Sequence, residues 1–202
     1  MAEQRATAAQ RAIVAVLAGG HGQRLGGDKA LAVLGGEPLI ERPLAAAREA
    51  ALEAIVVAKR STRLPPQAER VLYEPERPSH PLCGVIAALE LAAARSPAPA
   101  VLTLACDMPF LTGALLGWLA SLDGAAMARV GDRPQPLLAR CLPEHLPSLR
   151  QALAEQRSLR AAIGALSPRI VDERELARFG DPERLCFNVN DAEDLRLAEG
   201  WI

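Results

Sequence analysis

Aromatic side chains are scarce in this sequence: Phe, Tyr and Trp together make up 3% of its 202 residues. Hydrophobic residues of all kinds still account for 50% of the chain, and Ala and Leu dominate among them. A chain of this length with this apolar fraction can bury a full core. We expect an aliphatic core in a single domain over residues 1–202, with residues 1–12 frayed at its start.

An excess of charge of one sign is also lacking. The chain carries 23 Lys and Arg against 24 Asp and Glu, which gives a formal net charge of −1. Proteins that bind duplex nucleic acid usually carry a basic excess on one face. We therefore expect no nucleic-acid partner and a mixed, solvated surface, so that any anion site must be local.

Cysteine spacings typical of metal or redox sites are missing too. The four cysteines, at positions 83, 106, 141 and 186, form no CxxC pair, which argues against a zinc ribbon or a redox dithiol. No apolar run approaches the ~18 residues of a membrane-spanning helix. The first segment, MAEQRATAAQRA, lacks the apolar core of a signal peptide. We expect a cytoplasmic protein with reduced thiols and no membrane partner.

The chain does contain a regular alternation of short apolar runs and helical patterns. The apolar runs suit strands that are covered on both faces, as in a parallel sheet; they occupy residues 12–20, 53–60, 69–75 and 98–107. Apolar residues at helical spacing predict helices over residues 38–52, 81–96 and 112–122. This alternation predicts a three-layer α/β domain with right-handed crossovers.

The second half of the chain is less regular. Residues 125–141 predict two strands around a turn at GDRP. Residues 143–166 are mostly helical in pattern, and residues 168–173 predict another short strand. Residues 191–201 predict a final helix, with Asn190 or Asp191 as its cap.

A glycine-rich stretch, VLAGGHGQRLGGDKALAVLGG (residues 16–36), follows the first expected strand. Ligands of parallel α/β sheets bind beyond the carboxyl ends of the strands, where this loop must lie. Glycines let the backbone approach an anion, and Arg24 and Lys29 add charges that phosphates complement. The stretch therefore suits a polyphosphate. It fits neither the Walker GxxxxGK[ST] loop nor, with Leu25 in the last position, the GxGxxG dinucleotide fingerprint.

Two later motifs place polar side chains at the ends of expected elements. Asp107 ends the apolar strand in TLACDMPF, at the same sheet edge as the glycine-rich stretch. A carboxylate there can hold Mg²⁺, which prefers oxygen ligands, or can serve as a loop or cap residue. Asn188 and Asn190 flank Val189 in FNVNDAEDL. In a strand, that spacing places both amides on one face.

The ordered segments LAGG, RLGGDK and LGGEPLI resemble the signature of the sugar-nucleotide-type nucleotidyltransferases. Within that superfamily, LAGG and RLGGDK are most similar to the molybdenum cofactor guanylyltransferases of the MobA type. TLACDMPF, QPL (residues 135–137) and FNVNDAEDL are similar to later motifs of this family and occur in the expected order. The resemblance covers residues 13 to 201 and implies a three-layer, Rossmann-like nucleotidyltransferase fold with a mostly parallel sheet.

The resemblance also implies an activity and a set of site residues. The expected reaction transfers GMP from GTP to (molybdenum-)molybdopterin and releases pyrophosphate, with Mg²⁺ as cofactor and Asp107 as metal ligand. The implied catalytic residues are Arg24, Lys29 and Asp107. The implied nucleotide-binding residues are Leu17, Ala18, Gly19, Gly20, Gly22, Lys29, Lys59, Glu74 and Asp107. The implied acceptor-binding residues are Gln135, Asn188 and Asn190.

The resemblance further implies that the two halves of the chain bind different substrates. Residues 12–122 would form the nucleotide-binding half, and residues 123–202 the half that binds the acceptor. Molybdenum-insertion proteins and molybdoenzyme chaperones are the candidate protein partners.

Several positions depart from the family pattern. Glu74 stands where the family has Asp, Lys59 stands where it often has Asn, and Asp191 replaces the usual Thr. His80 precedes Pro81-Leu82-Cys83-Gly84, where the family has Gly before Pro-Leu-x-Gly. Three alternatives therefore stay open: a molybdopterin cytidylyltransferase, a transferase with another phosphorylated acceptor, and a non-catalytic nucleotide-binding module.

Overall fold

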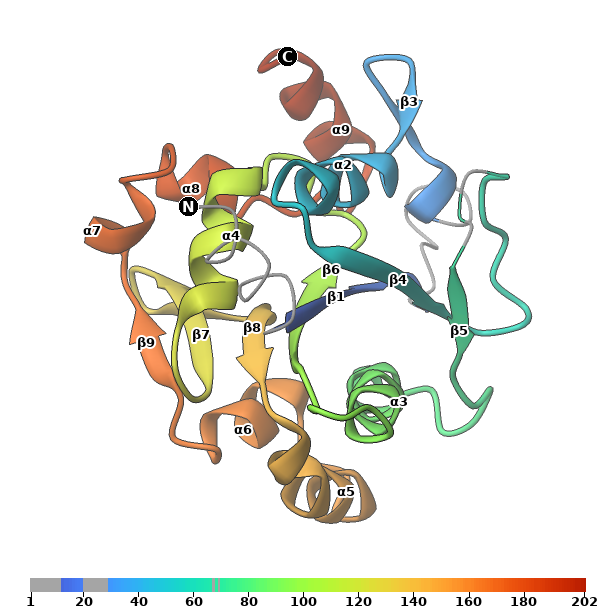
Figure 1. The fold of residues 1–202 in the computed structure, drawn as a ribbon. Helices are drawn as coiled ribbons and strands as arrows, with labels where there is room; N and C mark the ends of the chain where they lie inside the picture. The colour runs from blue at the N-terminus through green and yellow to red at the C-terminus, as the bar shows by residue number, and fades with distance from the viewer. Residues whose placement is uncertain (1–11, 20–28, 67, 69) are drawn as a thin grey trace.

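The computed structural model describes residues 12–19, 29–66, 68 and 70–202. Its centre is a seven-stranded sheet in the order β5-β4-β1-β6-β8-β7-β9, with helices on both faces (Figure 1). Within this sheet β8 runs antiparallel to both of its neighbours, and all other neighbouring pairs are parallel. The predicted three-layer α/β fold with a mostly parallel sheet is confirmed.

The first half of the chain alternates strands with helices, as its sequence pattern predicts. The strands are β1 (Ala12–Leu17), β4 (Glu53–Ala58), β5 (Val71–Tyr73) and β6 (Ala100–Ala105). The helices are α2 (Glu41–Glu49), α3 (Pro81–Ala93) and α4 (Gly113–Ser121). Each element lies within its predicted range but is a few residues shorter at its ends, because the flanking residues form turns and caps.

A short hairpin follows the 3₁₀ turn η2 (Lys29–Leu31) and precedes α2. Its strands are β2 (Val33–Leu34) and β3 (Glu37–Pro38), which pair antiparallel. Gly35 and Gly36 join them with φ of 61° and 85°. A two-residue hairpin turn of this kind needs positive φ at both positions, which glycine adopts at little cost.

The second half adds the remaining strands and helices. The hairpin of β7 (Ala126–Val130) and β8 (Arg133–Cys141) confirms the predicted strand pair. The elements after it are η3 (Pro143–His145), α5 (Leu146–Ala154), α6 (Leu159–Gly164), β9 (Arg169–Val171), α7 (Glu173–Leu176), α8 (Pro182–Leu185) and α9 (Ala192–Glu199). Asp191 is the cap of α9: its Oδ1 accepts hydrogen bonds from the amides of Glu193 and Asp194.

The sheet is buried on both faces, which explains the continuous apolar runs in its strands. In β1, Val14 and Val16 face the core shared with α2 and α4, whereas Ile13 and Ala15 face the core shared with α3. All four side chains are at most 2% exposed. Figure 1 shows α2 and α4 on one side of the sheet and α3, α5 and α6 on the other.

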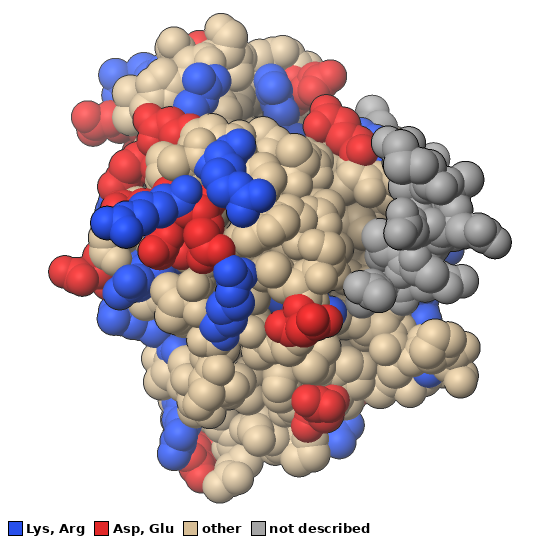
Figure 2. Space-filling view, turned by 60° about the vertical axis from the view of Figure 1, so that its left-hand side comes forward, with Lys and Arg blue, Asp and Glu red and all other residues tan. Residues whose placement is uncertain are grey.

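The surface carries charges of both signs. On the face shown in Figure 2, Lys and Arg side chains lie beside Asp and Glu side chains. Among residues 12–19, 29–66, 68 and 70–202, no helix combines the length and the apolar character needed to cross a bilayer.

The packing of α2 against α4 allows a test with two glycines of the same helix. A Cβ on Gly113 would lie 2.5 Å from Glu49 Cβ and 3.0 Å from the Ala50 backbone nitrogen. We expect Gly113→Ala to lower the free energy of unfolding by about 1–3 kcal/mol through overpacking.

Gly117→Ala is the matched control for that variant. The nearest atom to its added Cβ is Ala50 Cβ, at an ordinary 4.0 Å. Alanine favours the helix interior over glycine by about 1 kcal/mol, so this variant is expected to be more stable than the wild type. Urea denaturation measures both, and equal effects of the two substitutions would contradict the packing described here.

Candidate active site

A cavity of about 470 Å³ opens beyond the carboxyl ends of β1, β4, β5 and β6, the edge at which parallel sheets bind ligands. Its lining residues are Leu17, Gly19, Lys29, Lys59, Glu74, Ser79, His80, Pro81, Ala105, Cys106, Asp107, Leu137, Asn188 and Asn190. A cavity of this size, with a few convergent polar groups, is typical of a small-molecule site.

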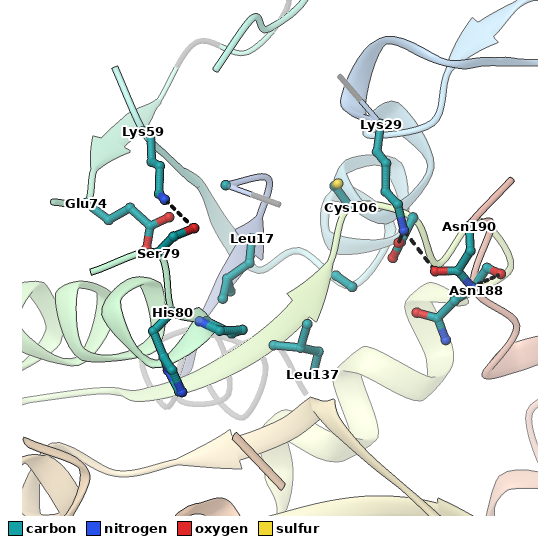
Figure 3. A pocket seen from close by; sticks show the side chains of 14 residues that line it. Leu17, Lys29, Lys59, Glu74, Ser79, His80, Cys106, Leu137, Asn188 and Asn190 are labelled. Atoms are coloured by element: carbon teal, nitrogen blue, oxygen red, sulfur yellow. Dashed lines mark hydrogen bonds and ion pairs between the residues drawn. The ribbon is translucent and has the colours of Figure 1, made fainter. Parts of the chain in front are cut away.

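The polar side chains of the cavity gather in two groups (Figure 3). Lys29, Asp107, Asn188 and Asn190 form one group, which we call the phosphate end. Lys59, Glu74 and Ser79 form the other, which we call the base end. Leu17, Cys106 and Leu137 lie between the two groups. A ligand that spans this cavity therefore needs polar parts at both ends and can be less polar in its middle.

The phosphate end is organised around the Lys29 ammonium. Its Nζ donates to Asp107 Oδ2 at 2.7 Å and to Asn190 Oδ1 at 2.8 Å. Asp107 and Asn190 follow Lys29 by 78 and 161 positions in the chain, so the contact joins three distant segments. The side chains of Lys29 and Asp107 are 18% and 11% exposed. A lysine has three N–H donors, so one remains for a ligand beside the two that hold the protein.

Backbone hydrogen bonds bring these segments together. The Cys106 amide donates to the Leu17 carbonyl at 3.1 Å, and the Val189 amide donates to the Asp107 carbonyl at 2.9 Å. The residues around Asn188 form no strand, so the strand geometry considered for this motif is wrong. Both asparagines nevertheless line the cavity while Val189 between them is fully buried, and the side-chain amides of Asn188 and Asn190 donate to the Cys186 and Asn188 carbonyls.

Three of the few aromatic side chains support the phosphate end from behind. Trp201 contacts Phe187 and Phe110, with ring centroids 4.9 Å and 5.4 Å away. Phe187 directly precedes Asn188, and Phe110 follows Asp107 by three positions. The Arg184 guanidinium lies 4.8 Å from the Phe110 centroid. The C-terminal helix region thus joins the two polar segments of the site through aromatic packing.

The phosphate end has the donor chemistry that Mg²⁺ requires. Asp107 Oδ1 is buried and makes no hydrogen bond within the described part of the chain, which leaves a carboxylate oxygen for a cation. The same part of the chain holds no cluster of three or more His, Cys, Asp or Glu side chains suited to a metal. Mg²⁺ commonly binds through one or two carboxylates together with substrate phosphates and water. Asp107 fits that mode of binding.

The base end holds two buried groups of opposite charge. Lys59 is 3% exposed and its Nζ donates to Ser79 Oγ at 2.9 Å. Glu74 is 9% exposed. Burial raises the pKa of the Glu74 carboxyl above its usual range; the Lys59 charge opposes this shift and the nearby Glu76 adds to it.

Two further lining residues have structural explanations. His80 is the N-cap of α3, and its Nδ1 accepts a hydrogen bond from the Leu82 amide at 3.1 Å. Burial raises the pKa of the Cys106 thiol far above its usual range. A buried thiol of this kind stays protonated, so it is unsuited to act as a nucleophile.

The cavity brings together most of the residues that the sequence singles out. Eight of them line it: Leu17, Gly19, Lys29, Lys59, Glu74, Asp107, Asn188 and Asn190. Ala18 lies just behind the lining, is buried, and donates its amide to the Val57 carbonyl. Gln135 stands on β8 but is not among the lining residues. Gly20, Gly22 and Arg24 lie outside the described residues.

Other lining residues were missed by sequence reasoning. They are Ser79, Pro81, Ala105, Cys106 and Leu137. Ala105 and Cys106 directly precede Asp107, and Ser79 and Pro81 flank His80 at the start of α3. For these four, the position at the end of an element near the sheet edge is the signal that could have identified them, whereas Leu137 lies within β8 and carries no such signal.

A family model described as the MobA-like NTP transferase domain matches residues 14–170. The chain belongs to the MobA-like NTP transferase family. The family that the motifs resemble is therefore confirmed, and the chain is a nucleotidyltransferase.

Curated relatives of this MobA-like NTP transferase are named molybdenum cofactor guanylyltransferases. The protein from Pseudomonas entomophila (strain L48) is 34% identical over 190 residues, covering 85% of this chain and 95% of the relative. The protein from Cereibacter sphaeroides is 35% identical over 198 residues, covering 93% of this chain and 95% of the relative.

Solved structures share the fold. Molybdopterin-guanine dinucleotide biosynthesis protein A from Archaeoglobus fulgidus matches with a TM-score of 0.75 and 26% identity, over 93% of this chain and 97% of that one. The 2-C-methyl-D-erythritol 4-phosphate cytidylyltransferase from Thermus thermophilus matches with a TM-score of 0.67 and 22% identity, over 95% and 98% of the two chains. At that lower identity, the second match shows the fold alone.

The raised pKa of Glu74 predicts how stability depends on pH. A carboxyl whose pKa is higher in the folded state contributes stability at low pH, and this contribution is lost as pH rises through the folded pKa. The neutral variant Glu74→Gln avoids that loss. We expect it to raise the melting temperature at pH 7.5, by an amount that shrinks as pH falls toward the ordinary pKa of about 4.5.

Glu76→Gln serves as the control of opposite sign. Hydrogen bonds from the Ser61 side chain and backbone lower the pKa of Glu76, so its removal is expected to lower the melting temperature at neutral pH. Thermal melts across the pH range measure both variants. A lower melting temperature for Glu74→Gln at pH 7.5 would show that Glu74 is not a buried, poorly compensated charge.

Proposed function

We propose that this chain is a Mg²⁺-dependent molybdenum cofactor guanylyltransferase. It transfers GMP from GTP to (molybdenum-)molybdopterin, which forms the guanine dinucleotide cofactor and pyrophosphate. The observation that carries the proposal is the meeting of Lys29, Asp107 and Asn190 at one sheet edge. The names of the relatives at 34–35% identity support it.

In this proposal the triphosphate of GTP lies at the phosphate end and the guanine at the base end. Lys29 contacts the phosphates directly, Asp107 would hold Mg²⁺ beside them, and Arg24 adds positive charge nearby. Backbone amides from Leu17 to Gly22 cradle the triphosphate, since glycines allow close approach. Residues 12–122 thus supply the nucleotide site.

The acceptor binds to residues of the second half, 123–202. Asn188 and Asn190 line the phosphate end, where their amides can donate to the terminal phosphate of molybdopterin. Gln135, which lies on β8, would contribute a further polar contact to the acceptor. Asn190 Oδ1 accepts a hydrogen bond from the Lys29 ammonium, which supports an acceptor site beside the charge proposed to contact the donor.

The chemical step is an in-line displacement at the α-phosphorus of GTP. A phosphate oxygen of molybdopterin forms the new P–O bond while the bond to the β-phosphate breaks and pyrophosphate leaves. A phosphate monoester is already ionised at neutral pH, so no strong general base is needed. Catalysis then depends on positioning and on neutralising charge.

Each residue of the phosphate end has a distinct part in this step. Asp107, through Oδ1 and Oδ2, would hold the metal and orient Lys29. The Lys29 ammonium offsets the charge that develops on the leaving pyrophosphate, and Asn190 fixes its position. When bound, Mg²⁺ would supply further positive charge to offset the charge of the phosphates.

One assay tests the proposal directly. The protein is incubated with Mg²⁺ and molybdopterin together with GTP, CTP or ATP in separate reactions, and the products are identified by mass spectrometry. We expect the guanine dinucleotide and pyrophosphate from GTP. A cytosine dinucleotide as the main product would replace the proposal with a cytidylyltransferase, and nucleotide binding without any product would indicate a non-catalytic module.

Asp107→Ala is expected to abolish turnover, with a loss of ~10³-fold or more, because it removes the carboxylate that would hold the metal beside the phosphates. The circular dichroism spectrum should remain that of the wild type. Pyrophosphate release measures the loss. Asp123→Ala, at an exposed carboxylate outside the cavity, is the control and should retain activity. Normal pyrophosphate release by Asp107→Ala would refute the metal assignment.

Lys29→Ala is expected to slow transfer by ~10²-fold or more, the scale of losing one oriented electrostatic donor. The same pyrophosphate assay gives the rate. Arg150→Ala removes an exposed cation that pairs with Glu90 outside the cavity, and it should leave the rate unchanged. If Lys29→Ala slows pyrophosphate release by less than about threefold, Lys29 takes no part in the mechanism.

A further inference from the structure

The two asparagines of the phosphate end lie on a stretch of chain without regular secondary structure. Residues 187–190 belong to no helix or strand, whereas Asp107 directly follows Cys106 at the end of β6. Among the described residues, one backbone hydrogen bond ties this stretch to a distant segment, from the Val189 amide to the Asp107 carbonyl. The direction in which the asparagines point therefore depends on how the neighbouring side chains pack.

The ring of Trp201 provides much of that packing. It meets Phe187 edge-on, with centroids 4.9 Å apart and an interplanar angle of 72°, and it meets Phe110 at 5.4 Å and 60°. Phe110 and Phe187 are themselves 6.4 Å apart, so the three rings form one group. Tilted and edge-on pairs at these distances are favourable because the edge of one ring faces the π-cloud of the other. The position of Phe187, and with it that of Asn188, follows the Trp201 ring.

Arg184 holds Trp201 in this position. Its Nη2 donates to the Trp201 carbonyl, and its guanidinium lies 4.8 Å from the Phe110 centroid and 5.9 Å from the Trp201 centroid. The Phe187 amide donates to the Arg184 carbonyl at 3.2 Å. One exposed arginine thus contacts all three rings or their backbone, although it lies outside the cavity lining.

The helix before Trp201 also contacts the β2–β3 hairpin, which follows the turn that carries the catalytic lysine (Figure 1). Leu34 of β2 shares a small buried cluster with Val189 and with Ala198 of α9. Ile202 Cδ1 lies 2.5 Å from the position that a Cβ on Gly35 would take. Residues 198–202 therefore touch each of the three segments that meet at the phosphate end.

We infer that Trp201 is a positioning residue for the acceptor: its ring fixes Asn188 and Asn190 at the phosphate end. The ring is not among the residues that line the cavity in the described part of the chain, so it acts through the asparagines. This inference rests on the proposed function, because it takes the two asparagines as the acceptor side of the site.

The nucleotide side of the site depends less on Trp201. Asp107 is fixed by the sheet, since the Cys106 amide donates to the Leu17 carbonyl at the end of β1. Lys29 keeps its ion pair with Asp107 when Asn190 moves. A misplacement of about 1 Å in a positioning group can slow a reaction by about 10²-fold. Loss of the Trp201 ring should therefore impair transfer to the acceptor more than binding of the nucleotide.

Two measurements on Trp201→Ala test this difference. The rate of guanine dinucleotide formation is measured against molybdopterin concentration at saturating GTP and Mg²⁺, and calorimetry gives the Kd of GTP with Mg²⁺. We expect kcat/KM for molybdopterin to fall by about tenfold or more while the Kd of GTP changes by less than about twofold. Trp201→Phe keeps a ring against Phe187 and Phe110 and should restore most of the lost activity.

Trp118→Ala is the matched control, because Trp118 is the other of the two tryptophans in the chain. It packs against Phe179 at 5.2 Å, with the guanidinium groups of Arg169 and Arg178 5.5 Å and 5.4 Å from its ring centre. It does not line the cavity. Its loss should lower the melting temperature without changing kcat/KM for molybdopterin, which separates positioning from a general loss of stability.

Arg184→Gln tests the same role without removing a ring. The residue is exposed, so the variant is expected to fold even if Trp201→Ala does not. It should lower kcat/KM for molybdopterin by about threefold, the scale of one cation–π contact, with an unchanged Kd for GTP. Arg178→Gln is its control, because Arg178 lies over the rings of Trp118 and Phe179 in the same manner.

The outcomes that overturn the inference differ from the one that overturns the proposed function. If Trp201→Ala and Arg184→Gln use molybdopterin as well as their controls do, Trp201 does not position the acceptor side. If Trp201→Ala weakens GTP binding as much as it lowers kcat/KM for molybdopterin, its ring supports the whole site and the inference is wrong. If the wild type forms no dinucleotide with any triphosphate, the proposed function itself fails.

Discussion

The site depends on one contact more than on any other: the Lys29 ammonium held between Asp107 and Asn190. This contact joins the loop after β1, the end of β6 and the segment before α9. A charged group with two short hydrogen bonds in a partly buried site has little freedom to move, because leaving either partner unsatisfied is costly. The phosphate end is therefore ordered before any ligand arrives, as electrostatic catalysis requires.

The surrounding fold supplies what this contact needs. The parallel strands β1 and β6 end at the same edge, and the amide after β6 bonds the last carbonyl of β1. The Val189 amide fixes the asparagine segment to Asp107, and Trp201 packs behind both segments. In a chain with few aromatic residues, half of the aromatic set packs behind this edge.

Buried charges are arranged differently at the two ends of the cavity. At the phosphate end, opposite charges are paired directly, and one carboxylate oxygen remains for a cation. At the base end, Lys59 donates to Ser79 instead, and both Lys59 and Glu74 line the cavity. The first arrangement would suit phosphates in the proposed function, and the second places a donor and an acceptor at the opposite end of the cavity.

Local patterns in the sequence determined the main strands and helices, the mostly parallel sheet and the family, but not the β2–β3 hairpin or the short helices α7 and α8. Apolar runs marked the buried strands, helical spacing marked α2, α3 and α4, and Asn190 or Asp191 marked the start of the last helix, where Asp191 is the cap. These features follow from neighbouring residues alone, so they can be recognised without a structure. Only the tertiary structure decided which side chains meet: Lys29 with Asn190 across 161 positions, Ser79 with Lys59, and Glu74 between Gly19 and Gly84. Such contacts depend on how separate elements pack, and no local pattern encodes a distance between residues far apart in the chain.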